Sequence, residues 1–201
     1  FYGWRRDFSA VIASNPHSDY RSDLITFPTP DVYSNGSNTI PATDGNFSGA
    51  FSRIRLVNTL LMNAANFGNQ AEIAQYVAEA RFFRAYIYFD LLQLFGDAPI
   101  IEGVVDVTDP VLTASRNNRS AVADFIIADI NAAIPGLPLE SDIASGNKGR
   151  VSRGTAQAFL SRVALFEGTW QKFRDNTARG SELLTIAADA AKDVMDSHQY
   201  E

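Results

Sequence analysis

Residues 78–95 of the chain read AEARFFRAYIYFDLLQLF. Wound as a helix, this stretch carries apolar and aromatic side chains on most of its sides, which indicates burial between neighbouring elements. Gly96 favours a helix end at that position, and Pro99 prevents the helix from resuming. We therefore predict a long central helix from about Gln70 to Phe95, around which the other elements pack.

Apolar residues also recur at helical spacing on both sides of this stretch. The pattern predicts helices over residues 51–67 and 122–133, a helix that begins after Ser152 and ends at Gly168, and a last one over residues 183–197. A short helix is expected over residues 1–12. The predicted fold class is all-α, with stacked antiparallel helix pairs that resemble tetratricopeptide repeats, and with long irregular loops.

Residues 15–50 are expected to form a long irregular loop within a single helical portion covering residues 1–201. This segment is rich in proline, glycine and small polar residues, and it has no apolar period. Loops longer than ~15 residues in compact proteins are usually functional or disordered. The last predicted helix lacks a partner, so we expect a C-terminal part of the full protein to follow Glu201.

The composition excludes several classes of function. The 201 residues are 46% hydrophobic and carry a net charge of −6, which favours a globular protein and argues against a nucleic-acid surface. The absence of cysteine excludes disulfides and thiolate chemistry. No apolar run approaches the ~20 residues that span a bilayer.

Five motifs between residues 51 and 200 occur in an order that resembles the SusD/RagB family. The central motif consists of Glu79, Arg81 and Arg84 in the long helix and of Gly96, Asp97 and Pro99 in the turn that follows. The other four lie at Ile54…Asn58, Asp124…Pro138, Gly149…Leu165 and Ala187…Tyr200. The tryptophan that often precedes the Ile–Asn helix in this family is absent, and Phe47 or Phe51 stands nearby instead.

The resemblance implies a nutrient-binding lipoprotein on the extracellular face of the outer membrane. It implies a lipid anchor on a cysteine upstream of Phe1. It also implies a SusC-type TonB-dependent β-barrel transporter as the partner, to which glycan, or sometimes peptide, is delivered. We expect no cofactor, and no nucleic acid as a partner.

Aromatic side chains outside the helical core are the candidates for ligand contact. Sugars bind to flat aromatic faces and to amide hydrogen-bonding groups, each stacking platform contributing roughly 1 kcal/mol. The predicted ligand-binding residues are Tyr33, Asn35, Asn38 and Phe47 in the long loop, and Trp170 after the fourth core helix. The alternative for Trp170 is a structural role, in which the indole packs a loop onto the helix bundle and does not contact ligand.

We predict no catalytic and no metal-ligating residues. The charges Glu79, Arg81, Arg84 and Asp90 are expected to form ion pairs, because buried charge must be compensated. The two histidines lie at opposite ends of the chain, without metal spacing. Two alternatives stay open: an all-helical glycoside hydrolase, which needs two carboxylates ~5–9.5 Å apart in a cleft, and a tetratricopeptide-type scaffold for protein interactions.

Overall fold

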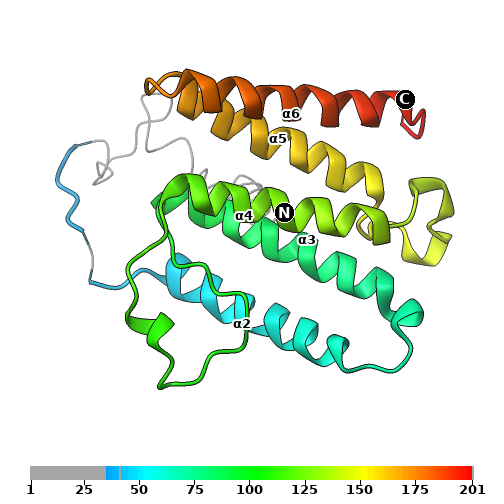
Figure 1. Ribbon diagram of the computed structural model, residues 1–201, viewed down its shortest axis with the longest axis horizontal. Helices are drawn as coiled ribbons and strands as arrows, with labels where there is room; N and C mark the ends of the chain where they lie inside the picture. The colour runs from blue at the N-terminus through cyan, green and yellow to red at the C-terminus, as the bar shows by residue number, and fades with distance from the viewer. Residues whose placement is uncertain (1–34, 41, 201) are drawn as a thin grey trace. The chain divides into compact units, whose positions relative to one another are not determined.

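The computed structural model describes residues 35–40 and 42–200. The chain divides into two units, residues 1–45 and 46–201, and each is described by itself. The described residues contain no strands. Their α-helices are α2 (Gly45–Ala65), α3 (Gln70–Phe95), α4 (Arg119–Ala133), α5 (Arg153–Lys172) and α6 (Thr177–Asp196), shown in Figure 1. The predicted all-α class is confirmed, whereas a single helical portion over residues 1–201 stays a prediction.

The helices stack in chain order, and consecutive helices run antiparallel (Figure 1). Helix α3 packs on α4, α4 on α5, and α5 most extensively on α6. Between α3 and α5 the chain forms four short 3-10 helices, at Pro110–Thr113, Ile134–Gly136, Glu140–Asp142 and Ser145–Asn147. Helix α2 joins the stack through its buried residues Ala50, Ile54 and Asn58.

The core lies between α3 and its neighbours. Side chains that are almost fully buried come from α2 to α6 and include Ile54, Tyr88, Leu91, Leu92, Ile126, Ile130, Val163 and Leu183. Burying a large apolar side chain of this kind contributes roughly 1.5–3 kcal/mol. The ring of Phe159 in α5 lies 5.4, 5.3 and 5.5 Å from the rings of Phe82, Tyr86 and Phe89 in α3. Three aromatic rings of α3 therefore pack against a single ring of α5.

The first described helix begins earlier than the sequence pattern predicted. Helix α2 starts at Gly45, inside the segment 15–50 that was expected to be loop, and not at Phe51. The Phe47 ring lies 4.9 Å from the ring of Phe51, one helical turn later, and 5.2 Å from that of Phe95. The apolar face therefore extends one turn further than the polar composition of the segment indicates.

The two last helices also correct the predicted boundaries. Helix α5 continues through Gly168 to Lys172, and α6 begins at Thr177, before the expected residue 183. A Cβ atom added at Gly168 would lie 3.1 Å from the Leu184 nitrogen and 3.2 Å from the Gly180 carbonyl oxygen. Gly168 thus permits a close crossing of α5 and α6, and it does not end the helix.

A buried polar network connects α2, α3 and α4. The Arg84 guanidinium donates from Nε to Asp129 Oδ2 at 2.6 Å and from Nη2 to Asp129 Oδ1 at 2.8 Å. Its Nη1 donates to Asn58 Oδ1 at 2.8 Å and to the Glu102 carbonyl at 3.2 Å. Arg81 lies 3.4 Å from the same aspartate. The arginine charge is thus compensated where water is excluded.

The same network fixes the connector that follows α3. Asn58 donates from Nδ2 to the carbonyls of Ile101 and Gly103, both at 2.9 Å. The Tyr88 hydroxyl accepts from the Ile101 nitrogen at 2.8 Å and donates to the Pro99 carbonyl at 3.3 Å. Burial raises the pKa of Tyr88 to about 12, because the phenolate would be poorly solvated there.

The other charges of α3 are placed nearer the surface. Glu79 accepts two hydrogen bonds from Arg150, at 2.9 and 2.6 Å, which tie α3 to the segment before α5. Asp90 is half-buried, and burial raises the pKa of its carboxyl above the ordinary value.

Candidate functional site

A polar hollow of about 540 Å³ opens where the end of α3, the start of α4 and the last turns of α5 meet. Its lining combines one indole ring with amide, carboxylate and guanidinium groups. The lining residues are Gln93, Leu94, Phe95, Gly96, Asp97, Arg116, Arg119 and Trp170. We refer to this set as the polar hollow.

The turn after α3 builds one wall of the polar hollow. Gly96 ends α3 with a φ of 71°, a left-handed conformation that residues with a Cβ rarely adopt. The Asp97 Oδ1 atom then accepts a hydrogen bond of 2.8 Å from the Arg119 backbone nitrogen, at the first residue of α4. Ala98 and Asn117 exchange two backbone hydrogen bonds of 3.2 and 3.1 Å. The end of α3 is thereby held against the start of α4.

Arg119 connects the three helices that surround the polar hollow. Its Nε donates to Glu167 Oε2 at 2.8 Å, and its Nη1 donates to the Leu92 carbonyl at 3.3 Å. The Glu167 side chain is 0% exposed and also accepts from Gln171 Nε2 at 2.7 Å. Because both ends of the ion pair are held, Arg119 has little freedom to turn.

Trp170 lies between two guanidinium groups. The Cζ atom of Arg119 is 3.9 Å from the centre of the indole ring, and that of Arg174 is 3.4 Å away. Two planar cations cannot share one face of a ring at these distances, so they cover opposite faces. Cation–π contacts of this kind contribute roughly 0.5–2 kcal/mol each. Arg174 is exposed and Arg119 is not.

The second aromatic candidate, Phe47, borders the same hollow. Its ring lies 5.2 Å from that of Phe95 and 5.2 Å from the Cζ atom of Arg116, and both of these residues line the hollow. The structure therefore brings Phe47 and Trp170 to one place, although they are far apart in the sequence. Their role in ligand binding stays a prediction.

The remaining predicted ligand residues belong to the first unit of the chain, residues 1–45. Asn35 and Asn38 are exposed and lie in the first unit, where Asn35 Oδ1 accepts from the Ser37 nitrogen at 2.9 Å. Tyr33 lies outside the described residues. Of the central motif, Gly96 and Asp97 line the polar hollow. The Pro99 carbonyl accepts from Tyr88 in the core instead.

The sequence reasoning missed Arg116, Arg119 and Arg174. Two of these arginines lie in the connector before α4 and in its first turn, where no apolar period or motif marks them. The partner of Arg119 is Glu167, 48 positions along the chain. Glu167 and Gln171 are four positions apart and lie one helical turn apart in α5, but the predicted helix was expected to end between them, at Gly168.

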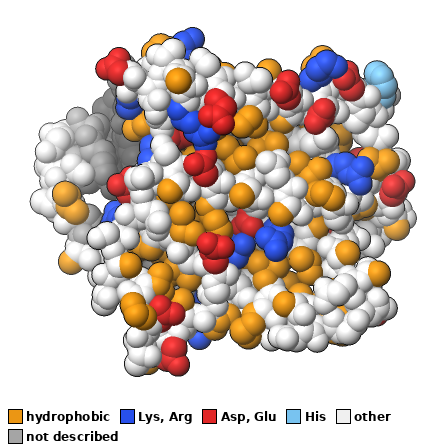
Figure 2. All heavy atoms as spheres, in the orientation of Figure 1, with side chains coloured by type: hydrophobic (Ala, Val, Ile, Leu, Met, Phe, Trp, Pro, Cys, Tyr) orange, Lys and Arg blue, Asp and Glu red, His pale blue; other side chains and the backbone are white. Residues whose placement is uncertain are grey.

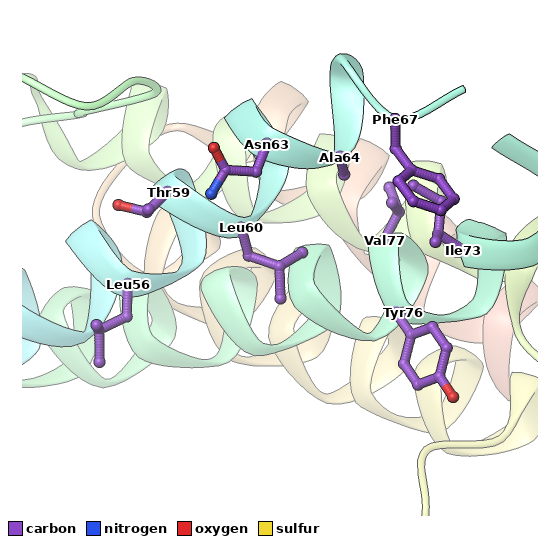
Figure 3. A pocket seen from close by; sticks show the side chains of 9 residues that line it. All are labelled: Leu56, Thr59, Leu60, Asn63, Ala64, Phe67, Ile73, Tyr76 and Val77. Atoms are coloured by element: carbon purple, nitrogen blue, oxygen red, sulfur yellow. The ribbon is translucent and has the colours of Figure 1, made fainter. Parts of the chain in front are cut away.

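A second hollow of about 540 Å³ lies between α2 and α3, and its walls are mostly apolar (Figure 3). Its lining residues are Leu56, Thr59, Leu60, Asn63, Ala64, Phe67, Ile73, Tyr76 and Val77. Figure 2 shows other hydrophobic side chains on the visible face of the molecule, interspersed with acidic and basic ones. Against the mostly apolar walls of this second hollow, a ligand rich in hydroxyl groups would leave those groups without hydrogen-bonding partners. The polar hollow is therefore the better candidate site.

Within residues 35–40 and 42–200, no three or more His, Asp or Glu side chains are grouped so as to hold a metal ion. Across this same part of the chain, none of the helices combines the length and the apolar character needed to cross a bilayer.

The family to which the chain belongs follows from its match to a family model. The model of the SusD-like proteins, described as "Starch-binding associating with outer membrane", matches residues 17–165. The chain belongs to the SusD-like family. A SusD-like protein of Bacteroides ovatus is 31% identical over 167 residues, which are 79% of this chain and 29% of that protein.

Solved SusD-like structures share the fold. A laminarin-binding SusD-like protein is 28% identical, with a TM-score of 0.64 over 81% of this chain and 32% of that one. A structure with a xylogluco-oligosaccharide is also 28% identical, with a TM-score of 0.60 over 78% of this chain and 30% of that one. The chain thus spans about a third or less of the length of these SusD-like relatives.

Proposed function

We propose that this SusD-like protein binds glycan at the cell surface and delivers it to a SusC-type TonB-dependent transporter in the outer membrane. The proposal is one of binding without catalysis. It includes a lipid anchor that holds the protein on the extracellular face of the membrane. Family membership supports the class of function, and the names of two solved relatives, which mention laminarin and a xylogluco-oligosaccharide, support glycan as the cargo.

The observation that carries the proposal for this chain is the polar hollow itself. It joins an indole ring to guanidinium, amide and carboxylate groups, the combination that binds sugar hydroxyls and C–H surfaces. Because arginines cover both faces of Trp170, we propose that the ring orients them, while the sugar meets the edges of the guanidinium groups and of the indole.

The carboxylates at the hollow have structural partners. Asp97 accepts from the start of α4, and Glu167 is fully buried against Arg119. Glycoside hydrolysis requires two carboxylates that flank an open cleft. These two side chains are therefore better explained as supports of the hollow than as an acid and a nucleophile.

Binding is tested with the full-length protein and a panel of oligosaccharides and peptides, using calorimetry. We expect an oligosaccharide to bind and Trp170→Ala to weaken the binding about fivefold or more, because each lost contact of this kind is worth roughly 1 kcal/mol. Tyr76→Ala is the matched control, since it truncates an aromatic side chain that is 53% exposed at the apolar hollow.

Three outcomes would contradict parts of this proposal. If only peptides bind, glycan is not the cargo and that part of the proposal is refuted. If Tyr76→Ala weakens binding and Trp170→Ala does not, the site lies in the apolar hollow. If the protein released from membranes does not co-purify with a β-barrel transporter, the delivery step is wrong.

A further inference from the structure

The polar hollow has an excess of positive charge, although the whole chain carries −6. Arg116 and Arg119 line it, and a third arginine, Arg174, stacks on the indole ring that forms part of the lining. Of the carboxylates there, Glu167 compensates Arg119 and Asp97 accepts from a backbone nitrogen. Among the described residues, no carboxylate forms an ion pair with Arg116 or with Arg174. Arg116 at the hollow and Arg174 on its indole ring therefore have no anionic partner in the part of the chain that the structure describes.

Both of these arginines are held by aromatic rings. The Arg116 guanidinium lies 5.2 Å from the centre of the Phe47 ring, and that of Arg174 lies 3.4 Å from the centre of the Trp170 ring. A guanidinium that stacks on a ring keeps its N–H donors in its own plane, directed away from the ring. At 3.4 Å from Trp170, Arg174 is fixed by such stacking and keeps its donors available for a bidentate anion. Arg116 lies over the Phe47 ring at the longer distance of 5.2 Å and is exposed to solvent.

Arg119 has a different part in the arrangement. Its side chain is 13% exposed and its charge is already compensated by Glu167. It covers the second face of Trp170, so it holds the ring against which Arg174 stacks. Arg119 is therefore a positioning residue, and Arg116 and Arg174 are the groups that reach solvent.

We propose that the polar hollow selects an acidic oligosaccharide, whose uronate carboxylate or sulfate ester is bound by Arg116 and Arg174. This inference rests on the proposed function, since it specifies the glycan bound at that site. The carboxylate and the sulfate ester share the feature that matters: at least two coplanar anionic oxygens that match the paired N–H donors of arginine. A neutral glycan would use the same hollow without satisfying these cations.

The test compares three oligosaccharides of equal length on the full-length protein by calorimetry. They are an oligogalacturonide, a sulfated galactan oligosaccharide and a neutral laminari-oligosaccharide. We expect one of the two acidic probes to bind at least about tenfold more tightly than the neutral one, and its affinity to fall as salt is added. The two acidic arms distinguish carboxylate from sulfate recognition.

Three variants locate the effect. Arg116→Gln and Arg174→Gln should each weaken binding of the acidic probe about tenfold, as expected for loss of a charged hydrogen bond, and should weaken binding of the neutral probe by a smaller factor. Arg162→Gln is the matched control, because Arg162 is an exposed arginine of α5 that neither lines the hollow nor stacks on Trp170. It should leave the affinity for every probe unchanged.

The outcomes separate this inference from the function on which it rests. If the neutral probe binds as tightly as the acidic ones, acidic selectivity is refuted while glycan binding stands. If an acidic probe is preferred but the Arg116 and Arg174 variants behave like Arg162→Gln, the assignment to this hollow is refuted. If no oligosaccharide of any kind binds, the proposed function fails and the inference fails with it.

Discussion

Replacing Asp129 by asparagine should severely destabilise the helical unit. The Asp129 side chain is 4% exposed and that of Arg84 is 5% exposed, so the variant leaves a charged guanidinium buried without its anion. An asparagine keeps the shape but provides one acceptor oxygen where the aspartate provides two, at 2.6 and 2.8 Å from Arg84. Breaking a buried pair in this way costs about 3–5 kcal/mol, against a total of about 5–15 kcal/mol for a typical domain.

Urea unfolding followed by far-UV circular dichroism measures the loss, and a thermal scan should show a midpoint lowered by about 6–20 °C for a unit of this size. The double variant Arg84→Met/Asp129→Leu is the control, because replacing both charges by apolar side chains removes the uncompensated cation. We expect it to be more stable than Asp129→Asn alone. A single variant within 1 kcal/mol of the wild type, or a double variant less stable than the single one, would refute the reasoning.

Two further predictions concern the core and the helix crossing. Tyr88→Phe should cost about 1 kcal/mol at neutral pH by leaving the Ile101 nitrogen unpaired. Because the folded-state pKa of Tyr88 is raised to about 12, its contribution to the free energy of unfolding is complete below pH ~10 and is lost as the pH rises through 12. Urea unfolding at neutral and alkaline pH should therefore show a smaller pH dependence of stability for the variant than for the wild type. An equal pH dependence for the two proteins would contradict this prediction. Gly180→Ala should destabilise by about 1–3 kcal/mol, since its Cβ would lie 2.8 Å from the Lys172 nitrogen. Gly49→Ala in α2 should be neutral or stabilising, because nothing lies within 4 Å of its Cβ; equal melting temperatures for the two alanine variants would contradict the crossing argument.

The sequence predicted the central helix well, because its signals are local. Helix α3 spans Gln70–Phe95, as expected from its apolar residues and from Gly96 and Pro99. The boundaries that failed depended on distant contacts. A glycine such as Gly168 commonly marks the end of a helix. Here it lies within α5, where a side chain would crowd α6 at the crossing of the two helices.

The site was less predictable than the fold, for the same physical reason. Trp170 was a candidate because a tryptophan outside the predicted core is notable in itself. Its arginine neighbours were not predictable, since Arg119 reaches it across the interface between α4 and α5. Likewise, the need of Arg84 for a partner follows from burial, but the choice of Asp129, 45 positions away, follows only from the packing of α3 on α4.

Two residues of the central motif, Gly96 and Asp97, line the polar hollow, and we propose that other residues decide its selectivity. Gly96 provides the left-handed turn, and Asp97 joins that turn to α4. The Arg84 network holds the connector that follows. Among the described residues Arg116 and Arg174 form no ion pair, and we propose that they, and not the groups of the motif, meet the charge of the ligand. It follows that exchanging these two arginines should change which glycan is preferred while the helices that form the hollow stay in place.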